Sequence, residues 1–205
     1  IELGKDGAHV HSAQEKAHLQ KTIWPAWPSD HVLNRDVVAA PVQHIAQLAG
    51  ISIPEGTQFL LVEEETTGAG SPFSGEKMCL VAAVYRSSDI DHAIAIINAN
   101  HQYSGAGHSC GIFSQNQAHI ERLAHETHTT RVVVNLPQAA TNTGNWNSGM
   151  PFTSSLGCGS WGGNIVSENI ALKHYMNTTW VISEIPYHRP SDEELFDGFL
   201  PRSKH

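Results

Sequence analysis

The chain has 205 residues, of which 40% are hydrophobic and 16% charged, and its formal net charge is −8 at pH 7. This length allows one domain with a substantial core. The acidic balance argues against a nucleic-acid binder, because such proteins concentrate lysine and arginine. No run approaches the roughly 18 apolar residues of a membrane span, and 3 cysteines are too few for a disulfide framework. We therefore expect a soluble protein of the reducing cytoplasm, with neither nucleic acid nor membrane as a partner.

The first part of the chain carries two well-marked helix starts. Ser12 and Glu15 have the spacing of a capping box, which predicts a helix that ends near Trp24. Pro41 suits a first helical position and Gly50 suits the end of that helix. Between them lies an apolar stripe at helical spacing, formed by Val42, Ile45, Ala46 and Ala49.

Two further helices are predicted in the middle of the chain. Ser88 is the expected N-cap of the first, whose apolar face would be formed by Ile90, Ala93, Ile94 and Ile97. Ser114 and Gln117 form a second capping pair, which leads into an apolar face of Ile120, Leu123 and Ala124.

Short β-rich runs alternate with these helices. They are QFLLV (58–62), CLVAAVY (79–85), CGIF (110–113) and RVVVNL (131–136). Each is apolar throughout, which is typical of strands buried on both faces. From residue 79 to residue 136 the order is β-α-β-α-β. The sequence therefore predicts an α/β fold with a largely parallel sheet and flanking helices.

The character of the chain changes after residue 136. Residues 136–164 are rich in glycine, asparagine, threonine and serine. A segment of that length is too long for an idle loop, so we expect it to line a site. A short helix is predicted around 167–175 and a β-prone run, TTWVISEI, covers 178–185. A polar tail follows Pro186.

The stretch LGCGSWGGN (156–164) spells a GxGxxG pattern through Gly157, Gly159 and Gly162. Three interpretations are open: a dinucleotide-phosphate cradle, a loop that presents Cys158 as a nucleophile, and close backbone packing. The preceding MPFTSSL is a poor strand, which disfavours the cradle. No basic residue lies in 150–165, which disfavours a reactive thiolate. Backbone packing is therefore the favoured interpretation.

Glu76 and His108 are the candidate functional residues. Glu76 follows a loop of small residues at the mouth of a buried strand, where parallel sheets bind ligands. His108 opens the next strand in a nearly uncharged setting, where it could exchange a proton with a substrate oxygen. Cys79 and Cys110 are expected in the core. His125 and His128 have the spacing of a metal pair, but no matching ligands accompany them, so no metal is expected.

These segments together resemble a known family. The series SPFSGEKMCLVAAVYRS, GAGHSCGIF, RVVVNLP and SLGCGSWGGNIVSENI is similar to the C-terminal part of CoA-acylating aldehyde dehydrogenases, including the corresponding half of bifunctional aldehyde–alcohol dehydrogenases. The upstream stretch VVAAPVQHIAQLAGISIPEGTQFLLVE extends the likeness, which covers about residues 5–185. LGCGSWGGN followed by SEN is its most specific piece.

The resemblance implies an oxidoreductase that converts an aldehyde and coenzyme A to an acyl-CoA. Such enzymes form a cysteine thiohemiacetal, pass hydride to NAD or NADP, and transfer the acyl group from the resulting thioester to CoA. Glu76 resembles the glutamate that hydrogen-bonds the nicotinamide ribose. His108 resembles a catalytic histidine near the reaction centre, as a proton acceptor or a CoA-site residue. The family uses no metal in this reaction.

The resemblance also predicts how this chain is organised. Residues 1–176 would be the aldehyde dehydrogenase catalytic domain, and residues 177–205 an oligomerisation strand and C-terminal tail. The run at 178–185 would pair with a neighbouring subunit, which implies a homo-oligomer. The family's nucleophile and NAD-binding domain would lie before residue 1. None of the cysteines occupies the nucleophile's place, so the isolated chain is expected to be inactive.

Other interpretations remain open. NTGNWNSGMPF is closer to sulfoacetaldehyde-type enzymes, and a sulfonate could bind amide donors such as Asn142, Asn145 and Asn147. A related phosphorylating or hydrolytic enzyme would share this domain. The chain could also be a non-catalytic α/β interaction domain that binds a partner through 178–185.

Overall fold

The computed structural model describes residues 8–10 and 12–199, with side chains from residue 12 onward. The chain divides into two compact units, Ile1–Ala171 and Leu172–His205. The predicted boundary between residues 176 and 177 stays a prediction. Within the parts of the chain that are described, no helix is long and apolar enough to cross a membrane.

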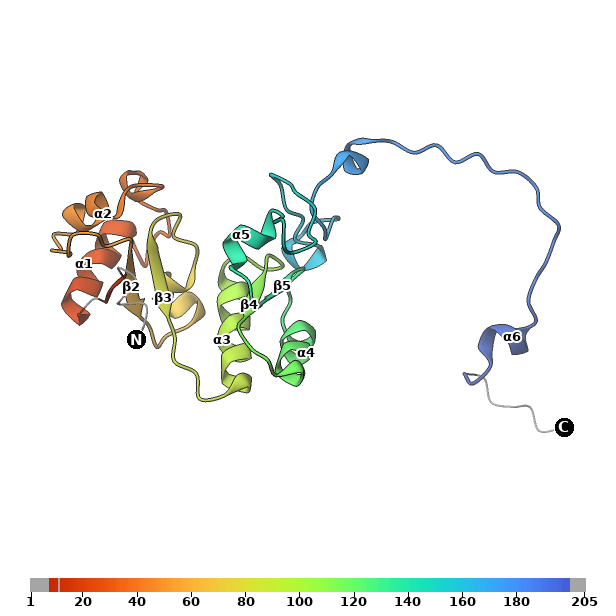
Figure 1. The fold of residues 1–205 in the computed structure, drawn as a ribbon, viewed down its shortest axis with the longest axis horizontal. Coiled ribbons are helices and arrows are strands. Elements are labelled where there is room, and N and C mark those ends of the chain that lie inside the picture. The colour runs from red at the N-terminus through yellow and green to blue at the C-terminus, as the bar shows by residue number, and fades with distance from the viewer. Residues whose placement is uncertain (1–7, 11, 200–205) are drawn as a thin grey trace. The chain divides into compact units, whose positions relative to one another are not determined.

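The first unit contains the parallel pairing that the sequence predicts, but in two sheets (Figure 1). One sheet has the order β1-β2-β3, formed by β1 (Ala8–Val10), β2 (Phe59–Glu63) and β3 (Val81–Val84). The other pairs β4 (Cys110–Ile112) with β5 (Val132–Val134). All pairs are parallel. The predicted β-α-β-α-β order is confirmed, although β3 and β4 belong to different sheets.

The first sheet is covered by α1 (Ala13–Ile23) and α2 (Val42–Leu48). The Ser12–Glu15 capping box that opens α1 forms as predicted. Trp24 and Phe73 meet edge to face, with ring centroids 5.1 Å apart. The core of this half consists of Leu19, Ile23, Trp24, Val37, Val42, Ile45, Ala49, Ile51, Leu60, Val62, Phe73 and Val81.

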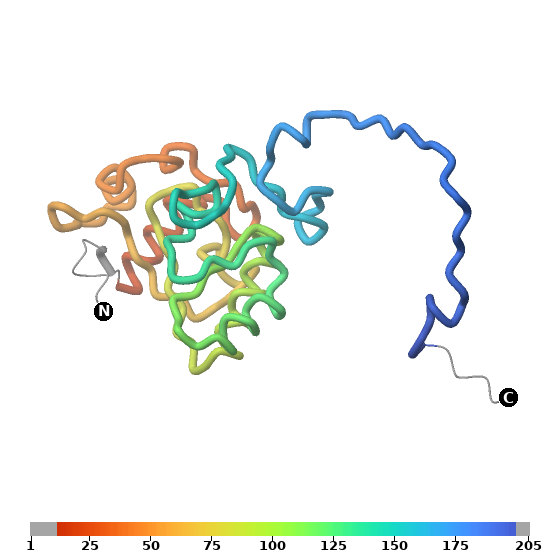
Figure 2. Tube along the Cα trace, turned by 45° about the vertical axis from the view of Figure 1, so that its right-hand side comes forward, coloured from red at the N-terminus to blue at the C-terminus, as the bar shows by residue number. Residues whose placement is uncertain are grey.

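The second sheet lies beside α3 (Ile90–Tyr103) and α4 (Gln117–Glu126) (Figure 1). These two helices run next to each other along the green part of the trace in Figure 2. The core of this half is smaller. Its buried members are Ile94, Cys110 and Leu123.

The predicted N-caps of these two helices are wrong by one and two residues. Asp89 caps α3 by accepting a 2.8 Å hydrogen bond from the His92 amide, and the Ser88 hydroxyl donates to Asp89 instead. Asn116 caps α4, while Ser114 accepts a hydrogen bond from the Asn116 amide. In both cases an Asx side chain close by outcompetes the serine for the free helix amides.

Residues 136–171 form a compact loop region with one short helix, α5 (Gln138–Asn142). The helix predicted around 167–175 is wrong, because residues 167–170 run antiparallel to the glycine-rich stretch, with a bridge between Leu156 and Asn169. Only a 3₁₀ turn, Leu172–Tyr175, forms in that range. The other 3₁₀ turns are Arg35–Val37, Gly68–Gly70, Pro72–Ser74 and Ser160–Gly162.

The second unit contains an extended run and α6 (Asp192–Phe196), which opens on a capping box from Ser191 to Glu194. Residues 178–185 are extended and form no ladder with any described part of the chain. Their apolar side chains are exposed, namely Trp180, Val181, Ile182 and Ile185. Pairing of this run with a second subunit therefore stays a prediction.

Candidate active site

The glycine-rich stretch 156–164 forms a tight reversal of the backbone. The Gly157 amide donates to the Glu168 carbonyl at 3.1 Å, and the Gly159 amide donates to the Val166 carbonyl at 2.9 Å. Gly159 has a φ of 62°, which a glycine adopts without strain. A dinucleotide cradle needs a strand, a turn and a helix, and the chain here returns on itself instead. The backbone-packing interpretation of GxGxxG is confirmed.

This reversal packs against the turn that leads into His108. A Cβ on Gly162 would lie 2.5 Å from the Cys158 Cβ and 2.7 Å from the Ala106 carbonyl oxygen. A Cβ on Gly107 would collide with the Cys158 carbonyl oxygen. The two segments therefore touch backbone to backbone, which only glycine permits. LGCGSWGGN and GAGH form one structural unit.

Arg131 holds this unit together, although nothing in its sequence context indicates that role. The residue is 7% exposed and opens β5. Its Nη1 donates to the Gly157 carbonyl at 3.0 Å and to the Thr130 hydroxyl at 2.8 Å. Burial lowers the pKa of Arg131, and an electrostatic interaction with Cys158 opposes that change. The structure thus brings a guanidinium to a cysteine that has no basic neighbour in sequence.

Asn169 continues the network away from Arg131. Its side-chain oxygen accepts from the Arg131 guanidinium, and its Nδ2 donates to the carbonyls of Asn142 at 3.0 Å and Pro151 at 2.7 Å. Both asparagines are buried. A hollow of about 530 Å³ lies next to β5, with Arg131, Asn142 and Met150 among its walls. The long loop predicted to line a site does line this hollow.

His108 is exposed, and its backbone is fixed by the same network. Its carbonyl oxygen accepts from the Thr130 hydroxyl at 3.2 Å. Its ring Nδ1 lies 2.7 Å from the Ser109 hydroxyl oxygen. A rigid backbone with an exposed imidazole suits a side chain that meets a ligand.

Glu76 is also exposed, in the loop between the 3₁₀ turn Pro72–Ser74 and β3. Its amide donates to the Ser104 hydroxyl at 3.3 Å, at the residue that ends α3. The segment that carries Glu76 is therefore tied to the helix end from which the chain proceeds to His108. No hydrogen bond or ion pair joins these two candidates within residues 12–199.

The cysteines sit in three different environments, all as free thiols. Cys110 is buried, with its sulfur 3.5 Å from the Thr127 hydroxyl. Cys79 packs against the first core, and burial raises its pKa while Lys77 opposes this. Cys158 is partly buried in the glycine-rich reversal. The expected core position of Cys110 is confirmed, whereas Cys79 is only partly buried.

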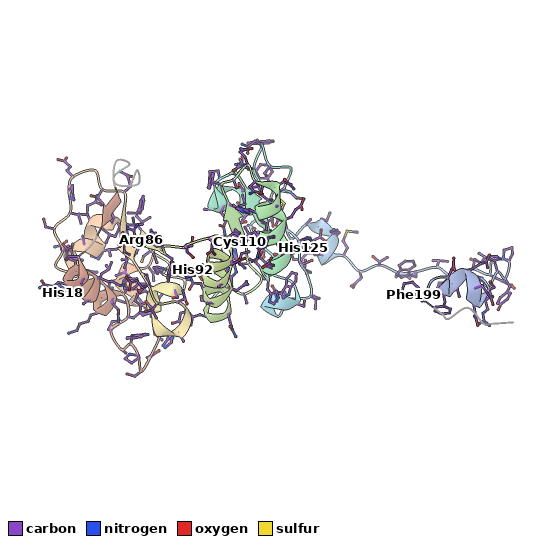
Figure 3. The ribbon with its side chains drawn as sticks, turned by 90° about the horizontal axis from the view of Figure 1, so that it is seen from below. His18, Arg86, His92, Cys110, His125 and Phe199 are labelled. Carbon is purple, nitrogen blue, oxygen red and sulfur yellow. The ribbon has the colours of Figure 1, made fainter. Side chains whose placement is uncertain are left out.

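The histidines whose side chains the structure describes do not gather into a metal site. His18, His92 and His125 lie on α1, α3 and α4 respectively (Figure 3). His128 instead stacks on Trp161, with ring centroids 5.8 Å apart. Across residues 8–10 and 12–199, no three His, Cys, Asp or Glu side chains are grouped closely enough to hold a metal ion.

A larger hollow, of about 910 Å³, lies at the carboxyl ends of β2 and β3. Its wall includes an ion pair in which the ammonium of the partly exposed Lys16 is 3.0 Å from a carboxylate oxygen of the buried Glu64. The Ser71 hydroxyl donates to the same carboxylate at 2.6 Å. Burial raises the pKa of Glu64, but these hydrogen bonds outweigh it and the net effect is a lowered pKa.

No family model matches the chain. It is 43% identical over 172 residues to a sulfoacetaldehyde dehydrogenase of an Acholeplasma species, covering 84% of this chain and 36% of the relative. It is 36% identical over 199 residues to an acylating sulfoacetaldehyde dehydrogenase of Bilophila wadsworthia, covering 97% and 43% respectively.

The fold matches a solved structure as well. A crystal structure of a probable aldehyde dehydrogenase from Listeria monocytogenes superposes with a TM-score of 0.80 at 32% identity, over 89% of this chain and 40% of that one. The chain thus spans about two fifths of the length of the proteins it resembles.

Proposed function

Because the chain belongs to the acylating aldehyde dehydrogenases, we propose that it forms the part of such an enzyme that positions cofactor and acyl group. The whole enzyme would convert an aldehyde and CoA to an acyl-CoA, with NAD or NADP as hydride acceptor. The observation that carries this proposal is the backbone contact between LGCGSWGGN and GAGH. It places the two most distinctive motifs of the chain in one rigid unit.

Glu76 would hold the nicotinamide ribose. An ionised carboxylate only accepts hydrogen bonds, which suits two ribose hydroxyl donors. Glu76 is exposed, so its carboxylate is accessible to a ligand, and its backbone is tied down by Ser104. The residues present therefore fit the cofactor. Correct placement of the ring relative to the reacting carbon is what such a contact supplies.

We place the reacting cysteine outside this chain. A nucleophile needs an accessible sulfur in a setting that favours the thiolate. Cys110 is buried among threonines, and burial raises the pKa of Cys79. Cys158 has Arg131 nearby, but it lies in a reversal whose backbone is packed against Gly107. In the full enzyme the cysteine sulfur would add to the aldehyde carbonyl, and the carbon of that thiohemiacetal would give its hydride to the nicotinamide. The CoA thiol would then take the acyl group from the resulting thioester and release the cysteine.

The experiment has two arms. The purified 205-residue chain, mixed with aldehyde, CoA and NAD or NADP, is expected to form no reduced nicotinamide. Turnover comparable to that of a complete relative would overturn the assignment of the nucleophile and make Cys158 the leading candidate. In the second arm, the chain replaces the matching part of the Bilophila wadsworthia relative, and this chimera is expected to turn over.

Within the chimera, Glu76→Gln tests the cofactor contact. It is expected to raise KM for the nicotinamide and to lower kcat by at least tenfold, because the ring loses its placement. Glu55→Gln, also an exposed glutamate before a strand, is the matched control. Equal kinetics of the two variants would remove Glu76 from the site. A folded chimera without any turnover would contradict the proposed function.

A sulfonated aldehyde is the second candidate for the substrate. Both curated relatives above are named for sulfoacetaldehyde. Of the predicted amide donors, Asn142 is buried and its Nδ2 donates to Ser109, so only Asn145 and Asn147 remain for a sulfonate. The test is the kcat/KM of the chimera for sulfoacetaldehyde divided by its kcat/KM for acetaldehyde, which shows which aldehyde it prefers. A ratio below one would reject this candidate.

The run at 178–185 is proposed to assemble the enzyme. Its exposed apolar side chains and extended backbone suit pairing with the sheet edge of a second copy. Light scattering should find an oligomer for the full chain and a monomer for a chain that ends at residue 176. Equal masses would contradict this role, and binding only to an unrelated protein would favour a non-catalytic interaction domain.

A further inference from the structure

Ser109 lies at the centre of a small hydrogen-bond cluster behind His108. The residue is 4% exposed. Its hydroxyl oxygen is 2.7 Å from His108 Nδ1, 2.7 Å from Gln138 Nε2 and 2.8 Å from Asn142 Nδ2. Two of these neighbours come from α5, the short helix in the long loop. A hydroxyl has one hydrogen and two lone pairs, so three partners saturate it and fix the role of each.

The Gln138 amide can be oriented from its contacts. Its Nε2 also lies 3.0 Å from the Ser109 carbonyl oxygen. A carbonyl oxygen only accepts, so the atom facing it must be the nitrogen. Gln138 therefore donates to Ser109 and occupies one lone pair of the hydroxyl.

The Asn142 amide is oriented by the cost of the alternative. As placed, Nδ2 donates to Ser109 and Oδ1 is a buried atom without a hydrogen-bond partner. Reversal would give Oδ1 the serine hydrogen but leave the buried NH₂ without an acceptor. Buried amide donors without acceptors are rarer than under-satisfied carbonyl oxygens. Asn142 therefore fills the second lone pair of Ser109.

With both lone pairs filled, the serine hydrogen has His108 Nδ1 as its acceptor. We propose that Ser109, held by Gln138 and Asn142, is a positioning residue that keeps His108 in the tautomer protonated at Nε2. The exposed ring then presents a hydrogen-bond donor. It suits an acceptor oxygen of the substrate, such as the carbonyl of an aldehyde or a thioester.

A second imidazole, that of His101, interacts electrostatically with His108. His101 is half-buried on the last turn of α3. Burial lowers its pKa, a backbone hydrogen bond with Ser109 raises it, and the electrostatic interaction with His108 lowers it again. The positive charge of His101 is therefore disfavoured both by burial and by its neighbour His108.

A proton on Nε2 changes the role expected of His108. In the tautomer protonated at Nε2, that nitrogen has no lone pair with which to accept a proton. A base role at Nε2 would first require the proton to move to Nδ1, against the serine hydrogen. The role in acyl transfer rests on the proposed function, whereas the tautomer is a property of the chain itself.

The test is long-range proton–nitrogen NMR of the full 205-residue chain with ¹⁵N-labelled histidine. The two neutral tautomers give different nitrogen shifts and cross-peak patterns. Spectra are recorded at mildly alkaline pH so that the rings are neutral, and the signal lost in His108→Gln identifies His108. The expected result for the wild type is a proton on Nε2. A proton on Nδ1 would overturn the proposal, whether or not the chimera is active.

Variants then assign the cause. Ser109→Ala should release the ring into a mixture of tautomers, and Gln138→Leu should do so partly. Thr130→Val is the matched control, because its hydroxyl bonds the backbone carbonyl of His108 and not the ring. An unchanged tautomer in folded Ser109→Ala would show that Ser109 does not set it. If Ser109→Ala does not fold, the wild-type spectrum still shows which tautomer is present, and Gln138→Leu still shows whether the cluster around Ser109 sets it.

Discussion

The Arg131 guanidinium donates two hydrogen bonds to the side-chain oxygen of Asn169, one from Nε at 3.1 Å and one from Nη2 at 2.8 Å. Asn169 in turn holds the carbonyls of the long loop. One buried cation therefore joins β5, the glycine-rich reversal and the loop between them.

Arg131→Lys is predicted to destabilise the fold by about 2 kcal/mol or more, because an ammonium cannot reproduce the planar fork and leaves buried acceptors unpaired. Arg35→Lys, at an exposed position, is the control and should change stability little. Urea denaturation measures both. Coincident unfolding curves for Arg131→Lys and the wild type would show that the paired hydrogen bonds of the Arg131 guanidinium do not contribute to stability.

Gly107→Ala and Gly105→Ala separate backbone strain from packing. Both glycines have positive φ, 78° and 91°, so alanine at either costs roughly 1–2 kcal/mol. Nothing lies within 4 Å of a Cβ at Gly105, whereas a Cβ at Gly107 meets the Cys158 carbonyl. Gly107→Ala should therefore be clearly less stable than Gly105→Ala in urea denaturation. Equal losses would mean that the two motifs are not in contact.

Much of the fold could be predicted because its signals are local. Runs such as CGIF are apolar throughout, which indicates a strand, and the Ser12–Glu15 spacing fixes a helix start. The expected burial on both faces is wrong for β4, in which only Cys110 is buried. The division into two sheets could not be predicted, since nothing in the residues of β3 or β4 indicates which edges pair. Strand pairing depends on contacts that are distant in sequence.

The candidate site shows the same limit. Glu76 and His108 were found from their places beside strands, and their roles stay predictions. Arg131 was missed because it opens an apolar run, where its sequence context indicates only a strand end. Its importance comes from Gly157 and Asn169, which the fold brings to it. The one available signal was a lone arginine before a buried strand.

Acid is predicted to weaken the ion pair of Lys16 and Glu64. The pKa of Glu64 lies below its ordinary value of 4.5, so its contribution to stability is present above that value. It is lost as the pH falls through the lower folded-state pKa. Wild-type unfolding free energy should therefore fall from about pH 6 to about pH 3 by more than that of Glu64→Gln.

Glu65→Gln is the control, because Glu65 is the next residue and is exposed. Its unfolding free energy should fall with pH as steeply as that of the wild type. The measurement is urea denaturation at a series of pH values. If the unfolding free energy of Glu64→Gln fell with pH as steeply as that of the wild type, the ionised Glu64 carboxylate would not stabilise the fold.

The two sheets should differ in amide exchange. Residues 60–62 of β2 are all buried, with Leu60 and Val62 in the larger core, whereas in β4 only Cys110 is buried. Opening of β4 and β5 should therefore cost less free energy. Hydrogen exchange followed by mass spectrometry should find faster uptake in peptides from 110–112 and 132–134 than in 59–63. Equal or slower uptake in the peptides from β4 and β5 would contradict the prediction that this sheet opens more easily.

The parallel registers also set the order in which the chain can assemble. The first sheet joins Ala8 to Phe59, while the second joins Cys110 to Val132 across a much shorter intervening segment. Each doubling of the loop that must close costs about 0.6 kcal/mol of chain entropy. The β1–β2 pairing therefore has the larger entropic barrier, whereas the β2–β3 pairing, which joins Leu60 to Val81, closes a loop as short as that of β4–β5. On a ribosome β1 emerges first, but its partner β2 follows only after the longest of these intervening segments, so the first strand made is the one that waits longest for its partner.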